Sequence, residues 1–196
     1  MTKVTCDMAM SVDGFVAGPN QRLDEPFGDG VAGRMDRWMF EQPEANAREI
    51  DAITSARAYI MGRNMFSPGR GEWDLDWKGW WGDDPPYHAP VFVLTNHPRE
   101  PLTMQGGTTF TFVTDGIQSA LAQAREAAGD VAIAGGAHTV NQYLAAGAIN
   151  ELRLHVSPFV LGSGERLFEG VADVNLEPIA VSGNELVTHL SYRVVR

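Results

Sequence analysis

The chain has 196 residues, of which 44% are hydrophobic and 20% charged, so it can form one domain with a sizeable core. Lys and Arg number 15 against 25 Asp and Glu, and the net charge of -10 argues against general nucleic-acid binding, which needs clustered cations. No run approaches the roughly 18 apolar residues that a membrane helix requires. The single Cys6 excludes an internal disulfide framework. Residues 1–14 lack the long apolar segment of an export signal, so we expect a cytoplasmic protein with no membrane partner.

The N-terminal half of the chain predicts short elements separated by long loops. A β-favouring run at residues 4–10 ends at an Asp-Gly pair, and an amphipathic pattern at 43–56 predicts a helix. A short apolar run at 58–61 predicts a buried strand. Residues 67–90 hold four of the five Trp and predict an irregular Trp-rich loop, and a loop of this length in a compact domain usually serves function.

The C-terminal half alternates strands with helices. We expect strands at 91–94, 109–113, 131–134, 152–156, 176–181 and 186–195, helices at 118–128 and 139–146, and a turn at 182–184. This alternation predicts an α/β fold with a mixed, mostly parallel central sheet and antiparallel C-terminal strands. No linker divides residues 1–196, so we expect a single domain.

Two predicted strands end in glycine at the start of a predicted helix. Gly135 and Gly136 precede Thr139, and without Cβ atoms they would let a phosphate approach the backbone near the N–H groups that open a helix. The alternative is that the two glycines only form a tight turn. Gly62 precedes Arg63, and a guanidinium there suits either a phosphate monoester or a surface salt bridge.

Several motifs of other enzyme classes are absent from the sequence. There is no G-x-G-x-x-G and no P-loop, which argues against the usual dinucleotide fingerprint and against kinases and GTPases. H-E-x-x-H and G-x-S-x-G are also missing. The 5 His show no metal-ligand spacing, so we expect no metal site.

Taken together, these segments resemble a known family. The stretches Ser-Val-Asp-Gly-Phe-Val-Ala (11–17), Ile-Met-Gly-Arg (60–63), Leu-Thr-Asn (94–96) and Ala-Gly-Gly-Ala (134–137) occur in the order seen in the dihydrofolate reductase-like superfamily. Residues 152–158 and 161–168 further resemble the bacterial branch similar to the C-terminal reductase domain of the bifunctional riboflavin-biosynthesis deaminase/reductase. The resemblance implies a three-layer fold with helices on both faces of the sheet, NADPH as hydride donor, and often a homodimer.

The resemblance also implies which residues contact the cofactor. Ala9 and Val16 would border the nicotinamide, and Gly62 and Arg63 would meet phosphates, with Arg63 selecting the 2′-phosphate of NADPH. The adenosine side would be lined by Leu94, Thr95 and Asn96, and the pyrophosphate would be held by Gly135, Gly136, Ala137 and Thr139.

Hydride transfer to a C=N or C=O bond also needs a proton. Asp13 is one catalytic candidate because it follows the first strand, and its alternative role is to form the turn there. His155 is the second candidate, since folate reductases have a substrate-facing Thr at this place, and its alternative role is a hydrogen-bonded core His. On the Trp-rich loop, Trp81, Tyr87 and His88 are candidates to contact substrate, or else they pack the loop.

We therefore expect an enzyme, an NADPH-dependent oxidoreductase acting on a small heteroaromatic or carbonyl substrate and resembling the riboflavin-biosynthesis reductase domain. The alternatives are dihydrofolate reduction, a non-catalytic nucleotide-binding protein of the same fold, and an acidic interaction module without a cofactor. The chain has no Pro-Trp-x-Leu-Pro stretch of the folate reductases, and Phe15 stands where the riboflavin branch usually has Lys or Arg.

Overall fold

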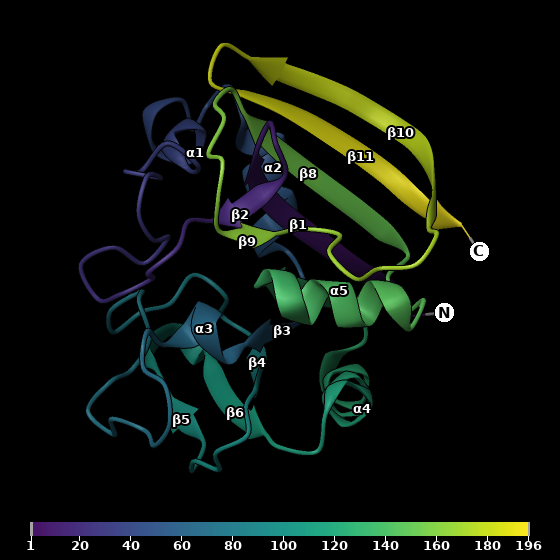
Figure 1. The fold of residues 1–196 in the computed structure, drawn as a ribbon. Coiled ribbons are helices and arrows are strands. Elements are labelled where there is room, and N and C mark those ends of the chain that lie inside the picture. Colours follow the sequence, from purple (N-terminus) through teal and green to yellow (C-terminus); the bar gives the residue numbers. More distant parts are fainter. Residues whose placement is uncertain (1, 196) are drawn as a thin grey trace.

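The computed structural model describes residues 2–195, and one nine-stranded sheet forms its centre (Figure 1). Its strands are β1 (Val4–Ser11), β3 (Ala58–Gly62), β4 (Pro90–Leu94), β5 (Leu102–Thr103), β6 (Thr109–Val113), β7 (Val131–Gly135), β8 (Glu151–Ser157), β10 (Asn175–Asn184) and β11 (Val187–Val195). They lie in the order β10-β11-β8-β1-β7-β3-β4-β6-β5. Two short strands, β2 (Phe15–Ala17) and β9 (Glu165–Arg166), form a separate antiparallel pair.

The large sheet is mixed and mostly parallel, which confirms the sequence prediction. β1 pairs in parallel with both β7 and β8, and β3, β4 and β6 continue the parallel arrangement beyond β7. β11 is antiparallel to β8 and to β10, and β5 is antiparallel to β6. Because six neighbouring strands run the same way, their carboxyl ends share one edge of the sheet, where ligands of α/β proteins usually bind.

Helices cover both faces of the sheet, as the resemblance implied. α4 (Ile117–Ala128) and α5 (Ala137–Ala145) pack on one face, and Figure 1 shows α5 in front of the sheet. Every second residue of β1 points into this core, which contains Val4, Cys6, Met8, Met10, Leu121, Val140 and Leu152. The other face is covered by α1 (Arg37–Glu41), α2 (Ala47–Thr54) and the loop 67–90, over a second core with Tyr59, Met61, Phe66 and Phe110.

The long helices lie close to their predicted positions, and one of the short helices was not predicted. α4 begins after Gly116 and ends before Gly129, one residue from the expected start. The helix predicted at 43–56 is observed only over 47–54, and α1 was missed because a helix of about one turn carries no readable periodicity. α3 (Arg63–Phe66) begins where a helix was expected to start, directly after Gly62. Within residues 2–195, no helix combines the length and the apolar character needed to cross a membrane.

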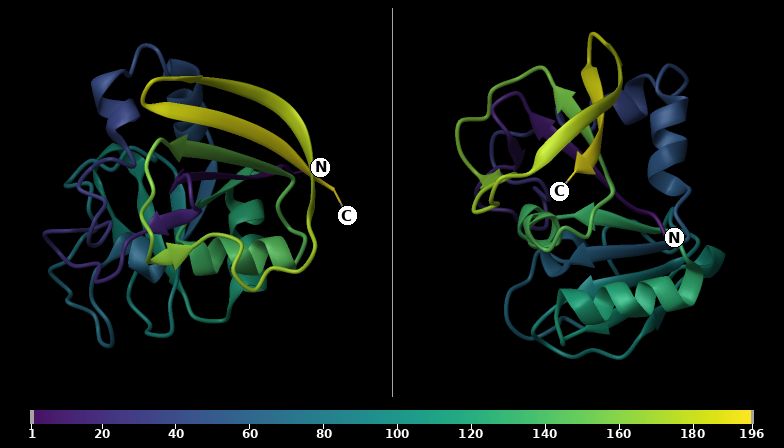
Figure 2. Two further views of the ribbon diagram at one scale, coloured as in Figure 1. Left: turned by 45° about the horizontal axis from the view of Figure 1, so that its top comes forward. Right: turned by 90° about the vertical axis from the view of Figure 1, so that its right-hand side faces the viewer.

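The last two strands form a long hairpin that bends beside β8 (Figure 2). The expected turn at 182–184 is wrong, because Ser182, Gly183 and Asn184 still pair with β11. The chain reverses at residues 185–186 instead. A Cβ on Gly183 would lie 2.4 Å from the Val187 carbonyl oxygen, so this glycine serves close strand contact and not the turn.

Candidate functional site

Two glycine-containing strand ends meet at the carboxyl edge of the sheet. β3 and β7 are neighbours, so Gly62 lies beside the start of α5. A Cβ on Gly62 would lie 2.5 Å from Thr139 Oγ1, and this contact requires glycine. Gly136 is the N-cap of α5, the Gly135-Gly136 peptide is cis, and the first N–H groups of the helix have no partner within it. The structure thus gathers these four predicted residues with Ala137 on α5, and their contact with a cofactor stays a prediction.

Arg63 follows at the start of α3 and lies against the Trp-rich loop. Its guanidinium carbon is 3.9 Å from the ring centroid of Trp73, and Nη2 donates weakly to the Glu72 carbonyl at 3.3 Å. Nε is buried and has no hydrogen-bond partner in residues 2–195, and Arg63 forms no ion pair there. Burial lowers the pKa of Arg63. The structure therefore holds a partly desolvated cation next to Gly62, with no carboxylate within ion-pair distance among residues 2–195, although the charge of Glu72 acts on it from farther away.

Trp73 links Arg63 to the end of β4, a contact that the sequence did not reveal. The indole N–H of Trp73 donates to the His97 carbonyl at 2.8 Å. The backbone N–H of His97 in turn donates to Thr95 Oγ1 at 3.1 Å. Leu94 is half-buried, Thr95 is buried and Asn96 is exposed, so the predicted adenosine side is a short polar segment fixed by the Trp-rich loop.

The carboxyl end of β1 is fixed by Asp13. Ser11 Oγ donates to Asp13 Oδ1 at 2.6 Å, and the backbone N–H groups of Leu161 and Gly162 donate to the two carboxylate oxygens at 3.0 and 2.7 Å. These hydrogen bonds, that from Ser11 first, lower the pKa of Asp13 to about 2. Asp13 is therefore ionised at neutral pH and holds two loops together, which matches its alternative role of forming the turn.

Ala9 and Val16, which were predicted to border the nicotinamide, come before and after Asp13 in the chain. Ala9 is half-buried on β1 and directly opposite His155 of β8. Val16 is buried in the core shared with α5, so little of its side chain is open to a ligand. His155 is itself buried, with hydrogen bonds to His189 and Asp7. In the described part of the chain, no three His, Cys, Asp or Glu side chains gather as a metal ion would require.

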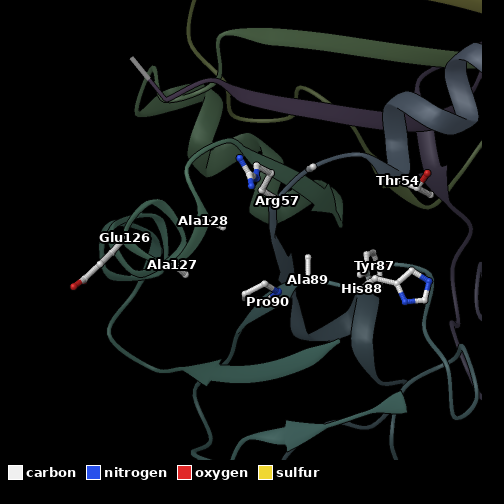
Figure 3. A pocket seen from close by; sticks show the side chains of 10 residues that line it. Thr54, Arg57, Tyr87, His88, Ala89, Pro90, Glu126, Ala127 and Ala128 are labelled. Carbon is white, nitrogen blue, oxygen red and sulfur yellow. The ribbon is translucent and has the colours of Figure 1, made fainter. Parts of the chain in front are cut away.

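Two of the predicted substrate residues lie at the opposite edge of the sheet. Tyr87 and His88 precede β4, and they line an open depression of about 700 Å³ with Thr54, Arg57 and the end of α4 (Figure 3). Trp81 stacks on Phe110 at 6.0 Å and touches Tyr87 edge-on. The structure does not bring Tyr87 and His88 to Gly62 and Gly135, because the length of β4 separates the two edges.

Comparison with protein families decides the relationship of the chain. Residues 2–188 match the RibD C-terminal domain. The chain belongs to this family. Protein YyaP of Bacillus subtilis (strain 168) is 23% identical to this RibD C-terminal domain over 189 residues, which are 90% of this chain and 86% of YyaP.

Solved structures confirm the dihydrofolate reductase-like fold of this RibD C-terminal domain. A putative riboflavin biosynthesis protein from Shewanella sp. PV-4 has a TM-score of 0.69 at 21% identity, with both chains fully covered. Dihydrofolate reductase from Enterococcus faecalis, solved with NADP(H) and RAB-propyl, has a TM-score of 0.56 at 14% identity, covering 98% of this chain and 96% of its own. At these identities the likeness establishes the fold, and function has to be argued from the site.

Proposed function

We propose that this RibD C-terminal domain is an NADPH-dependent reductase that transfers a hydride to a small heteroaromatic or carbonyl substrate. The observation that carries the proposal is Arg63, a half-buried guanidinium that forms no ion pair among residues 2–195, beside the glycine edge of β3 and β7. An acidic protein that leaves such a cation unpaired at a strand end has a local site for a phosphate group. The family, which consists of NADPH-dependent pyrimidine reductases, supports the same reading.

The residues present fit NADPH. In this proposal Arg63 binds the 2′-phosphate, and backbone N–H groups of Gly136, Ala137 and Thr139 hold the pyrophosphate at the start of α5. Gly136 has no atom within 4 Å of where a Cβ would stand, which leaves room for a phosphate to approach its backbone, and Gly62 allows the close contact with Thr139 that positions the start of α5. Leu94, Thr95 and Asn96 line the adenosine side, and Ala9 and Val16 border the nicotinamide. Bound NADPH supplies a hydride, and the chain supplies orientation and a proton.

Calorimetric titration with NADPH and then NADH tests this proposal. We expect clear preference for NADPH, and we expect Arg63→Ala to weaken NADPH binding by at least tenfold while NADH binding changes little. Arg57→Ala is the matched control, because Arg57 is an exposed arginine at the opposite edge of the sheet. Equal weakening of both cofactors would contradict the 2′-phosphate assignment, and no binding of either would refute the reductase.

One observation favours a second candidate, a nucleotide-binding protein of the same fold without catalysis. The Asp13 carboxylate is occupied by three hydrogen bonds and ionised, so it holds no proton to donate. A screen of electrophilic substrates, read as NADPH oxidation, separates the two candidates. Turnover of any substrate contradicts the non-catalytic protein, and tight NADPH binding without turnover across heteroaromatic and carbonyl compounds supports it. A homodimer also stays a proposal, which sedimentation equilibrium tests.

A further inference from the structure

A short turn follows α3 and brings the chain back toward this helix. The N–H of Ser67 donates to the Arg63 carbonyl at 2.8 Å and closes the helix. Gly71 then has a φ of +73°, a left-handed conformation that glycine adopts without strain, and the chain changes direction there between Arg70 and Glu72. One cation and one anion are thereby carried back to the start of α3.

Arg70 is a second cation beside Arg63. Its Nη1 donates to the side-chain oxygen of Asn64, the residue that follows Arg63 on α3. Burial is the largest cause of the lowered pKa of Arg63, and the charge of Arg70 lowers this pKa further, against the opposite effect of Glu72. Neither guanidinium has a carboxylate within ion-pair distance in the part of the chain that the structure describes. Because two like charges repel each other, an anion bound between them is stabilised by both.

Glu72 places one carboxylate near these cations without an ion pair to either of them. Its Oε1 lies 3.4 Å from His97 Nδ1, and its side chain is 94% exposed. Its backbone carbonyl accepts the weak hydrogen bond from Arg63 Nη2 at 3.3 Å, which keeps the residue beside Arg63. An exposed carboxylate with so few contacts can turn into water at little cost. The charge of Glu72 therefore opposes the binding of another anion here, although its side chain can move aside.

These three side chains lie where two neighbouring parallel strands end. Gly62 pairs with Leu94, so Arg63 and Thr95 follow the ends of β3 and β4 side by side. In the proposed function this is the adenosine side of the cofactor, and NADPH differs from NADH there by a phosphate monoester on the ribose. Such a group carries a charge of roughly −1.5 to −2 at pH 7, so each added cation strengthens its binding and each added anion weakens it.

We propose that Arg70 binds the 2′-phosphate of NADPH together with Arg63, and that Glu72 competes with this phosphate for the two guanidiniums. The inference rests on the proposed function and adds two residues of opposite effect that lie outside the Gly62–Arg63 segment. Arg70 and Glu72 are specificity-determining residues, because they act on the choice between NADPH and NADH and contact no reacting atom. Inorganic phosphate shares the chemistry of the 2′-phosphate and is therefore one of the probes below.

Calorimetric titration of single variants with NADPH and NADH tests the two effects, which have opposite signs. Arg70→Gln should raise the Kd for NADPH about fivefold, and Glu72→Gln should lower it about two- to threefold, as expected for exposed charges. The Kd for NADH should change less than about twofold in both variants. Arg193→Gln and Glu177→Gln are the matched controls, since they change the net charge equally at an exposed ion pair on the C-terminal hairpin. Neither control should alter the preference for NADPH.

Adenosine 2′,5′-bisphosphate and adenosine 5′-monophosphate probe the same contact without the nicotinamide. Arg70→Gln should weaken the binding of the bisphosphate only, and inorganic phosphate should bind the wild type far more weakly than the bisphosphate does. Inorganic phosphate that binds as tightly as the bisphosphate would overturn the cofactor role of Arg70, and equal effects of Glu72→Gln and Glu177→Gln would overturn the role of Glu72. A wild-type preference for NADPH that Arg70→Gln leaves unchanged refutes this inference alone, whereas a wild type that binds neither NADPH nor NADH refutes the reductase.

Discussion

Replacing Trp73 by leucine separates the position of the Arg63 guanidinium from its charge. The ring centroid of Trp73 lies 3.9 Å from the guanidinium carbon of Arg63. The indole ring packs edge-on against Phe66 and Phe112, and its N–H donates a hydrogen bond to the His97 carbonyl. Leucine keeps an apolar contact with the two phenylalanines and removes the π face and the N–H donor. Arg63 then keeps its charge and loses the surface that orders it.

The expected cost follows from that geometry. A cation–π contact is worth roughly 0.5–1 kcal/mol at exposed sites and about 2 kcal/mol when desolvated, and Arg63 is half-buried. Ordering a free side chain on binding costs about 0.5–1.5 kcal/mol. We take about 1 kcal/mol as the penalty that NADPH binding meets in Trp73→Leu. That corresponds to about a fivefold rise in Kd for NADPH, and NADH, which has no 2′-phosphate, should change less than twofold.

Calorimetric titration of wild type and variant with both cofactors measures this difference. Trp80→Leu is the matched control, because Trp80 belongs to the same loop and its ring contact is with Trp77. The far-ultraviolet circular dichroism of both variants should match the wild type. Equal affinity for NADPH in Trp73→Leu and wild type would refute the reasoning, since Arg63 would then be ordered without the ring.

Three further predictions concern stability and local order. Gly62→Ala should destabilise the fold by about 1–3 kcal/mol in urea unfolding, because its Cβ would lie 2.5 Å from Thr139 Oγ1, and adding Thr139→Ala should recover most of that loss. Asp13→Asn should speed hydrogen exchange at the Leu161 amide, and unchanged exchange would show that the loop is held otherwise. Burial lowers the pKa of His189 in the folded protein below its ordinary value of 6.5, so at lower pH the unfolded chain binds more protons than the folded one. The free energy of unfolding should therefore fall as the pH drops below about 6.5. His189→Gln should flatten that pH dependence.

Most of the fold could be predicted from the sequence, because the patterns that indicate strands and helices involve residues close together in the chain. The apolar run at 131–134 and the alternation of strands with helices predicted β7 and the parallel sheet, and α4 begins within one residue of its expected start. The turn at 182–184 was misplaced, because a Ser-Gly-Asn stretch also suits a strand whose glycine admits a close neighbour. Elements of about one turn, such as α1, lie below what periodicity can resolve.

The sequence could predict the parts of the site that lie at strand ends. It could not predict the parts that depend on which residues pair across neighbouring strands. Gly62 and Gly135 could be placed together because parallel strands share a carboxyl edge. Tyr87 and His88 were predicted to contact substrate, and their position before β4 sets them at the opposite edge from Gly62 and Gly135. The Asp7 partner of His155 lies 148 residues away in the chain, and only the pairing of β1 with β8 brings the two together.

The position of β1 in the sheet determines how late in synthesis the sheet can be completed. In the described chain β1 alone joins β8 and the C-terminal hairpin to β7 and the strands beyond it. Among the described strands β1 comes first in the sequence, and its partner β7 follows roughly 120 residues later. β3, β4 and β6 can pair earlier, while β1 waits with both edges unsatisfied. The glycine edge can form once β7 pairs with β3, whereas the contacts of His155 with Asp7 and His189 need β1, β8 and β11 together. A nascent chain halted before β8 holds an open strand that chaperones or other chains can capture.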